Sequence, residues 1–150
     1  MKTFYLIDPK DITIQDIKEV LNIESNEYSE ESQVSLESCI NAFNINPNIY
    51  FMFKDIRNNK IVSNIDICPI TDECYNIIKS GKFKDCNINS NMIISYNNDV
   101  KYYNLYFRGI TIRKEYRNSN GLLYSMLKFL KKKYIEFEYK GYYIKRMIML

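Results

Sequence analysis

The residues with the clearest chemical potential are the cations and turn-forming residues that follow Ile112. Arg113, Lys114 and Arg117 stand in or beside residues 117–121, which are Arg-Asn-Ser-Asn-Gly. Asn and Gly tolerate positive φ, so this cluster predicts a tight turn. The backbone N–H groups that begin a following helix, together with neighbouring cations, form a site suited to phosphate. The alternative is that these residues serve only to bend the chain.

Two regular elements would hold this turn in place. Residues 106–112 are rich in β-branched and aromatic side chains, which predicts a strand. After the turn, apolar residues recur at helical spacing, at Leu122, Leu123, Met126, Leu127, Leu130 and Tyr134. The residues off that face are polar, namely Ser125, Lys128, Lys131 and Lys132. This pattern predicts an amphipathic helix.

The unit formed by residues 105–135 resembles motif A of the GCN5-related N-acetyltransferases, the GNAT superfamily. That motif is a strand, an Arg/Gln-x-x-Gly-x-Gly/Ala loop and a helix, and it holds the pyrophosphate of acetyl-CoA. The loop here keeps Arg117, with Asn120 at the first Gly and Leu122 at the last small residue. A one-residue shift would instead place Gly121 at the first Gly.

The resemblance implies that acetyl-CoA is the co-substrate. It assigns the pyrophosphate to the loop residues Arg117, Asn118, Ser119, Asn120, Gly121 and Leu122. It also implies that the pantetheine arm pairs with the backbone of the preceding strand, at Ile110, Thr111 and Ile112. Gly109 would then mark a bulge or splay in that strand, unless it is a glycine tolerated in a twisted strand.

A second resemblance lies in residues 69–81, a Pro-Ile-Thr-Asp-Glu-Cys-Tyr segment that ends in Ser-Gly. Some GNAT proteins carry a similar insertion between their third and fourth strands. The expected element order, β-α-α-β-β-(α)-β-α-β, matches the GNAT fold from its first strand through its fifth. The resemblance therefore implies one GNAT-like α/β (α+β) domain over residues 1–150. Its sheet would be mixed, mainly antiparallel and twisted, flanked by helices, and the fold would be shortened at its C-terminus.

Local signals set the expected boundaries. Strands are predicted over residues 2–7, 49–54, 60–68, 101–112 and 142–150, with 91–96 as a short strand or an irregular link. Thr13 with Asp16 predicts a capping-box helix start, and Thr71 predicts the cap of a short helix. Between them, Ser29 or Ser32 is expected to cap a helix, after a loop over residues 22–29. Pro69 is expected to end its strand.

Composition removes several classes of chemistry. The 150 residues carry a net charge of +3, with 46% hydrophobic and 15% aromatic side chains, which fits one folded domain. The absence of histidine excludes Ser-His-Asp and Cys-His catalysis and His-ligated metals. The four cysteines form no C-x-x-C pair, so no metal site is expected. No secretory or membrane-spanning stretch is found, and a cytoplasmic protein with reduced cysteines is expected.

The general base is not identified by the sequence. Many GNAT proteins place a carboxylate on the fourth strand, and the nearest match here is Arg108, which cannot act as a base. The carboxylates that could work through water are Asp66, Glu24 and Glu27. The phenols that could donate a proton, or serve only for packing, are Tyr102, Tyr103 and Tyr106.

The resemblance implies a GNAT-like N-acetyltransferase that transfers acetyl from acetyl-CoA to an amine of unknown identity. Arg108 and the altered loop leave open a catalytically inactive domain that binds acyl-CoA or another protein, or a fragment of a longer protein. Lys128 and residues 131–133 form a basic surface that is either solvated or binds the 3′-phosphate of CoA or an acidic partner. Nucleic acid is not expected, because no recognition motif is present. We expect a homodimer through the strand over residues 142–150, whose edge and apolar face lack neighbours.

Overall fold

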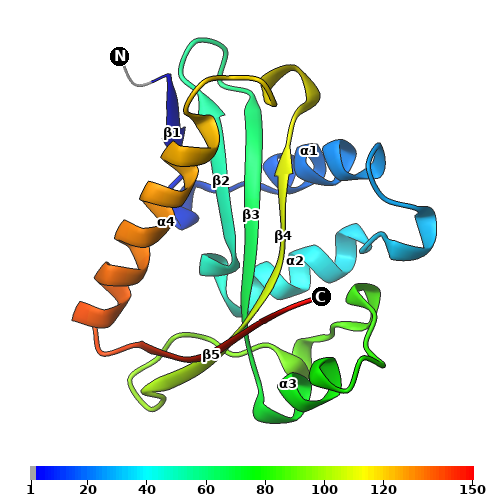
Figure 1. The fold of residues 1–150 in the computed structure, drawn as a ribbon, viewed down its shortest axis with the longest axis vertical. Coiled ribbons are helices and arrows are strands. Elements are labelled where there is room, and N and C mark those ends of the chain that lie inside the picture. Colours follow the sequence, from blue (N-terminus) through cyan, green and yellow to red (C-terminus); the bar gives the residue numbers. More distant parts are fainter. Residues whose placement is uncertain (1–2) are drawn as a thin grey trace.

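A five-stranded sheet forms the centre of the computed structural model, which describes residues 3–150 (Figure 1). In spatial order the strands are β1 (Phe4–Leu6), β2 (Tyr50–Asp55), β3 (Ile61–Ile70), β4 (Tyr102–Ile112) and β5 (Tyr143–Met149). Neighbours from β1 to β4 are antiparallel, and β5 is parallel to β4. The expected mixed, mainly antiparallel sheet is confirmed. Lys2, which the sequence assigned to the first strand, lies outside the described residues.

Helices pack on both faces of this sheet (Figure 1). The face that carries α1 (Ile14–Ser25), α2 (Leu36–Ile45) and α3 (Asp72–Lys79) takes alternate β2 side chains, including Met52. The opposite face carries α4 (Leu122–Tyr139) and takes the other set, including Phe53. This alternation follows from the two-residue period of a strand, and it builds a separate apolar core on each face.

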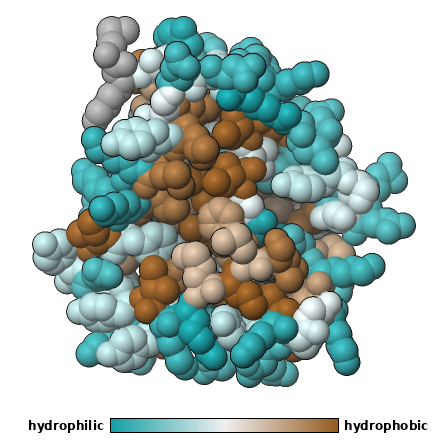
Figure 2. Space-filling view, in the orientation of Figure 1, coloured by the Kyte–Doolittle hydropathy of each residue, from teal (hydrophilic) through white to brown (hydrophobic). Residues whose placement is uncertain are grey.

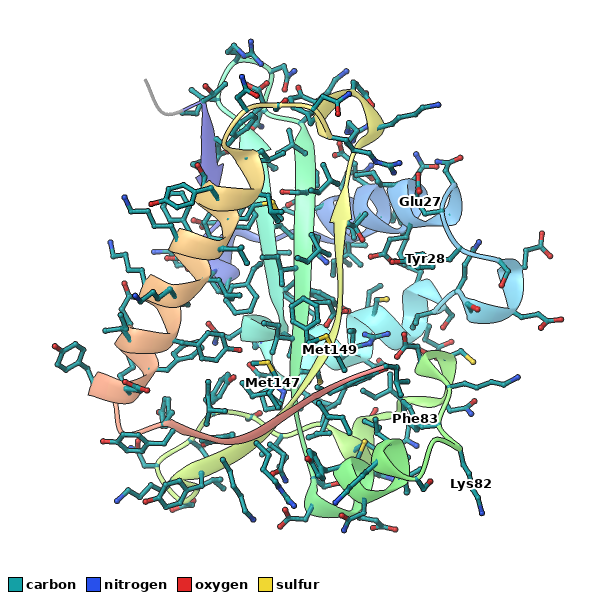
Figure 3. All side chains as sticks on the ribbon, in the orientation of Figure 1. Glu27, Tyr28, Lys82, Phe83, Met147 and Met149 are labelled. Atoms are coloured by element: carbon teal, nitrogen blue, oxygen red, sulfur yellow. The ribbon has the colours of Figure 1, made fainter. Side chains whose placement is uncertain are left out.

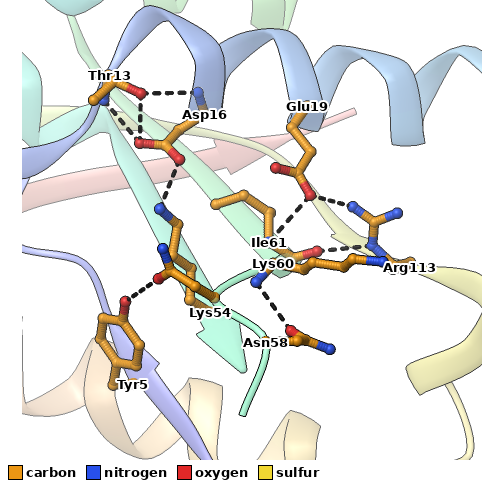
Figure 4. Close-up of polar contacts among 10 residues, drawn as sticks. Tyr5, Thr13, Asp16, Glu19, Lys54, Asn58, Lys60, Ile61 and Arg113 are labelled. Carbon is orange, nitrogen blue, oxygen red and sulfur yellow. Dashed lines mark hydrogen bonds and ion pairs between the residues drawn. The ribbon is translucent and has the colours of Figure 1, made fainter. Parts of the chain in front are cut away.

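The start of α1 is fixed by the capping box that the sequence predicted. Thr13 Oγ1 accepts from the backbone N–H of Asp16, and Asp16 Oδ2 accepts from the backbone N–H of Thr13, at 3.2 and 2.9 Å (Figure 4). Asp16 Oδ1 also lies 2.8 Å from Lys54 Nζ on β2. One carboxylate therefore both begins the helix and ties it to the sheet.

Three predicted boundaries are wrong. Residues 22–25 belong to α1 rather than to the loop over residues 22–29, because Ile23 is buried in the core and extends the packed face. The cap of α2 is Ser35, whose Oγ accepts from the backbone N–H of Ser38 at 3.1 Å; Ser29 begins a 3₁₀ turn, Glu30–Ser32. β3 continues past Pro69 to Ile70. The carbonyl of Pro69 points away from β4 and accepts from Ile94 N–H, so the N–H that proline lacks is not needed for pairing with β4.

The predicted strand–turn–helix unit is present, with β4 followed by a turn and then by α4. Gly121 precedes α4 with φ of 81°, a left-handed conformation that glycine adopts without strain. Residues 91–96 form an irregular link, with a 3₁₀ turn at Ser90–Met92 and one isolated bridge between Ile70 and Ile93.

The four cysteines are free; Cys39, Cys68 and Cys74 are buried, and Cys86 is half-buried. Within residues 3–150, no group of three or more His, Cys, Asp or Glu side chains is arranged to hold a metal ion. No helix in this described range is long and apolar enough to span a bilayer.

Candidate active site: a carboxylate pocket beside the open edge of β4

The second half of β4 has a strand neighbour on one side only among the described residues. β5 pairs with β4 from Tyr102 to Phe107, whereas β3 pairs with β4 as far as Ile112. The β3–β4 register shifts at Arg108, which is the extra residue of a β-bulge next to Gly109. The expected bulge at Gly109 is therefore confirmed, and the β4–β5 pairing ends just before it, at Phe107.

Backbone groups on this open edge are available to a ligand. Arg113 N–H donates to Val62 O, so antiparallel alternation turns the N–H and C=O of Ile110 and Ile112 away from β3. Arg117 Nε donates to Ile112 O at 3.1 Å, which is consistent with this direction. The backbone of Thr111 faces β3 instead, and its side chain points toward α1.

A groove of about 340 Å³ runs along this edge. It is lined by Glu27, Tyr28, Ile110, Thr111, Ile112 and Arg117. The structure thus brings together four of the residues assigned to acetyl-CoA by resemblance. Arg117 also forms an ion pair with Glu27 across the groove, so a phosphate would compete with that carboxylate for the guanidinium.

The rest of the predicted phosphate loop lies elsewhere. Asn120 and Gly121 line a separate groove of about 710 Å³ between β1 and α4, together with Lys128 and Lys132. Leu122 is 2% exposed and packs into the α4-side core, and its backbone N–H donates to Ser119 O at 3.2 Å. The remaining members, Asn118 and Ser119, line neither of these two grooves.

Carboxylates gather on the α1 side of the bulge, in a cavity of about 130 Å³. Its polar lining includes Glu24 from α1, Asp66 from β3, Asp85 from the loop after α3, and Arg108. Arg108 Nη1 donates to Asp66 Oδ2 at 2.9 Å, and these side chains are 9% and 14% exposed. Thr111 Oγ1 donates to Glu24 Oε1 at 2.9 Å. Tyr106 OH donates to Asp85.

Burial controls the protonation of this carboxylate pocket. It raises the pKa of Asp66 from 3.8 to about 6, and Arg108 only partly opposes the rise. It likewise raises the pKa of Glu24, against the hydrogen bond from Thr111 and the charge of Arg108, and the pKa of Asp85, against Arg108. Burial alone would lower the pKa of Arg108, but Asp66 and the other nearby acidic groups raise it, so the guanidinium stays charged.

Several buried polar atoms here have no hydrogen-bond partner among the described residues. They are Arg108 Nε, Asp66 Oδ1 and, at the floor, Asn64 Oδ1. A cavity of about 20 Å³ adjoins the carboxylate pocket and shares Glu24, Asp66 and Arg108 with it. Such a space has room for about one water molecule, which could bridge these atoms.

The carboxylate pocket meets the open-edge groove. Tyr28 and Thr111 line both, and Figure 3 labels Tyr28 and Glu27 in the segment that follows α1. The Tyr28 hydroxyl lies beside Gly109, 3.7 Å from where a β-carbon on that glycine would stand. Burial, and then the charges of Glu24 and Asp85, raise the pKa of Tyr28, so its phenol remains protonated.

Sequence reasoning named Asp66 and Glu24 but could not choose between them and Glu27. The structure places the first two in the carboxylate pocket and Glu27 in the groove. Of the three tyrosines, only Tyr106 hydrogen-bonds to a pocket residue. Tyr103 donates to backbone carbonyls, and Tyr102 is exposed, with its ring tilted by 40° against that of Tyr143. Asp85 and Tyr28 were missed. A carboxylate and an arginine, each inside an apolar strand, were the available signal, because buried charges need partners.

Solved structures share this arrangement of elements. The loading GNATL domain of CurA from Lyngbya majuscula superimposes with a TM-score of 0.55 at 19% identity, over 88% of this chain and 58% of that one. An aminoglycoside acetyltransferase, meta-AAC0020, from an uncultured soil metagenomic sample has a TM-score of 0.53 at 12% identity, over 98% of this chain and 75% of that one. The BH1408 protein from Bacillus halodurans, solved as a tetramutant, has a TM-score of 0.52 at 10% identity, over 99% of this chain and 83% of that one.

The chain has a GNAT fold. At these identities the likeness establishes the fold alone. No protein family and no curated protein matches the sequence itself. The chain spans 58% of the length of the CurA domain. The comparisons do not support the C-terminal shortening that we expected.

Proposed function

We propose that the protein is an N-acetyltransferase that transfers acetyl from acetyl-CoA to an amine. One observation carries this proposal: the open edge of β4, where a thioester arm can pair, meets a carboxylate pocket at Tyr28 and Thr111. Acetyl transfer needs these two features side by side, because the thioester must be positioned and the attacking amine must lose a proton.

The cofactor would lie in the open-edge groove. The outward N–H and C=O groups of Ile110 and Ile112 supply backbone pairing for the amide-containing pantetheine arm. Arg117 lines the groove beside Ile112, so it could meet a pyrophosphate placed beyond that residue, and it would exchange Glu27 for the phosphate. Asn118, Ser119, Asn120, Gly121 and Leu122 remain assigned to the pyrophosphate by resemblance.

The reaction needs a base and a proton donor, which we assign to Glu24 and Tyr28. Glu24 has one oxygen held by Thr111, which leaves the other to take a proton from the amine. The amine nitrogen attacks the thioester carbon, the N–C bond forms, and the C–S bond breaks. The CoA thiolate leaves and takes the proton of Tyr28, which borders both the groove and the pocket.

Calorimetric titration with acetyl-CoA, CoA and dephospho-CoA, followed by an assay of acetyl transfer to a panel of amines, tests this function. We expect acetyl-CoA to bind and Glu24→Gln to reduce kcat by about 10²- to 10⁴-fold with little change in acetyl-CoA affinity. Glu138→Gln, an exposed change on α4, is the matched control and should leave kcat unchanged. Binding without transfer to any amine would instead support an inactive acyl-CoA-binding domain, and no binding would refute the cofactor site.

We also propose that two copies associate through β5. Within residues 3–150, β5 pairs only with β4, so its other edge exposes unpaired backbone groups. Its exposed side chains include Ile144, Met147 and Met149, and Figure 2 shows apolar side chains gathered on this face of the molecule. Light scattering over a concentration series should give a dimer mass, and a monomer at every concentration would refute the proposal.

A further inference from the structure

The carboxylate pocket contains more negative charge than it can neutralise. Asp66 has Arg108 as its ion-pair partner. No ion pair within the described part of the chain involves Glu24 or Asp85, the other two carboxylates that line the pocket. The other arginines each pair with a different carboxylate, for example Arg113 with Glu19 and Arg117 with Glu27. Two partly buried carboxylates thus lack a cation.

Most of the unpaired hydrogen-bonding atoms at this site are acceptors, as expected for a pocket with excess negative charge. Glu24 and Asp85 each accept one side-chain hydrogen bond and retain a second oxygen. Asp66 Oδ1 and the Oδ1 of Asn64, a residue only 1% exposed, are acceptors without a partner. Among the buried atoms at this site, the unpaired donor is Arg108 Nε, which one water could satisfy. An occupant rich in donors and without acceptors completes this set.

We propose that the amine acceptor is a short aliphatic diamine, with one ammonium bound by Asp85 and the reacting nitrogen placed at Glu24. Two positive charges match the two unpaired carboxylates, and two ammonium groups supply six N–H donors. The cavity of about 130 Å³ has room for several heavy atoms, which permits a short chain such as that of 1,4-diaminobutane. The proposal rests on the acetyl-transfer function and names the class of its acceptor.

The two ends of such a diamine have different surroundings. Glu24 is held by Thr111, whose backbone lies in β4 between Ile110 and Ile112, so this end of the pocket faces the open edge. Asp85 is held by Tyr106, which precedes the bulge and lies where β4 still pairs with β5. The nitrogen at Glu24 can therefore lose its proton and attack, while the nitrogen at Asp85 stays protonated and fixes the position of the chain.

Calorimetry with the CoA-saturated protein compares 1,4-diaminobutane with n-butylamine, which has the same carbon chain and one charge fewer. We expect the diamine to bind about tenfold to hundredfold more tightly, the range for one charge-assisted hydrogen bond. Asp85→Asn keeps an acceptor for Tyr106 but removes the charge, and it should bring the two affinities within about twofold. Asp99→Asn, an exposed change outside the pocket, should retain the full preference.

The acetyl-transfer assay with the same ligands separates the two proposals. Transfer to butylamine and diaminobutane at equal kcat/KM, with equal affinities, would overturn the diamine assignment and leave the acetyltransferase function standing. An Asp85-dependent preference for the diamine without transfer to any amine would support the binding site and refute acetyl transfer. A preference that survives Asp85→Asn would also overturn the proposal, because the second charge would then be recognised elsewhere.

Discussion

The buried pair of Asp66 and Arg108 gives the sharpest prediction of stability, and the change to make is Asp66→Asn. Burial and the attraction of Arg108 act in opposite directions on the Asp66 carboxylate, and burial prevails, since the pKa rises from 3.8 to about 6. A rise of about 2 units corresponds to about 3 kcal/mol, by which the fold favours protonated over ionised Asp66. Asparagine resembles the protonated form, so the variant should escape this penalty.

The sign of the pH dependence follows from the raised pKa. Stability from Asp66 is fully present below pH 3.8 and is lost as the pH rises toward 6, because the folded state holds the proton more tightly than the unfolded chain. Between pH 4.5 and pH 7.5, the free energy of unfolding of the native protein should therefore fall relative to Asp66→Asn by about 2 kcal/mol. The other carboxylates titrate in both proteins, so their contributions to the difference in free energy of unfolding largely cancel.

Urea unfolding followed by circular dichroism at a series of pH values measures this difference, and Asp99→Asn is the control for a change of charge at an exposed site. The reasoning fails if Asp66→Asn loses stability relative to the native protein as the pH rises. That result would show that the attraction between Asp66 and Arg108 exceeds the cost of burying the carboxylate.

Two further predictions concern the elements around the site. Asp16→Ala should lower the free energy of unfolding by about 3–5 kcal/mol at pH 7, because it leaves Lys54 buried without a partner. The control Asp11→Ala, at an exposed site, should change that free energy by less than about 0.5 kcal/mol, and urea titration measures both. Burial alone would raise the pKa of Asp16, but Lys54 and Thr13 outweigh burial, so the net pKa lies below 3.8. The stability that ionised Asp16 contributes should therefore be lost as the pH falls below 3.8. Gly109→Ala should leave the melting midpoint within about 2 °C, since the added methyl meets only the Tyr28 hydroxyl at 3.7 Å, yet it should slow acetyl transfer by narrowing the pocket; an unchanged rate would contradict our placement of the acceptor.

The fold could be predicted well wherever a local pattern decides it. Thr13 and Thr71 were recognised as caps because each has an acidic residue in the first turn that follows. The start of α2 was missed because Ser29, Ser32 and Ser35 all qualify as caps, and the choice depends on which segment buries its apolar face. Such a choice depends on tertiary packing, which a short window does not contain.

The candidate site divides in the same way. The resemblance assigned the pantetheine arm to the backbone of Ile110, Thr111 and Ile112; the strand pairing leaves Ile110 and Ile112 facing outward and turns Thr111 toward β3. The carboxylate pocket could not be derived, because Thr111 and Glu24 are 87 positions apart and Arg108 and Asp66 are 42 apart. Contacts at such separations are fixed by the folded topology and leave no periodic trace in the sequence.

The different burial of the four cysteines allows ligand binding to be followed by the rate of thiol alkylation. Cys86 is half-buried and directly follows Asp85, which lines the carboxylate pocket, whereas Cys39, Cys68 and Cys74 are buried. Burial raises the pKa of those three thiols, to about 11 for Cys74, which suppresses the reactive thiolate. An alkylating reagent should thus modify Cys86 first, at a rate that changes when the pocket fills, and should reach the other three only when the chain opens.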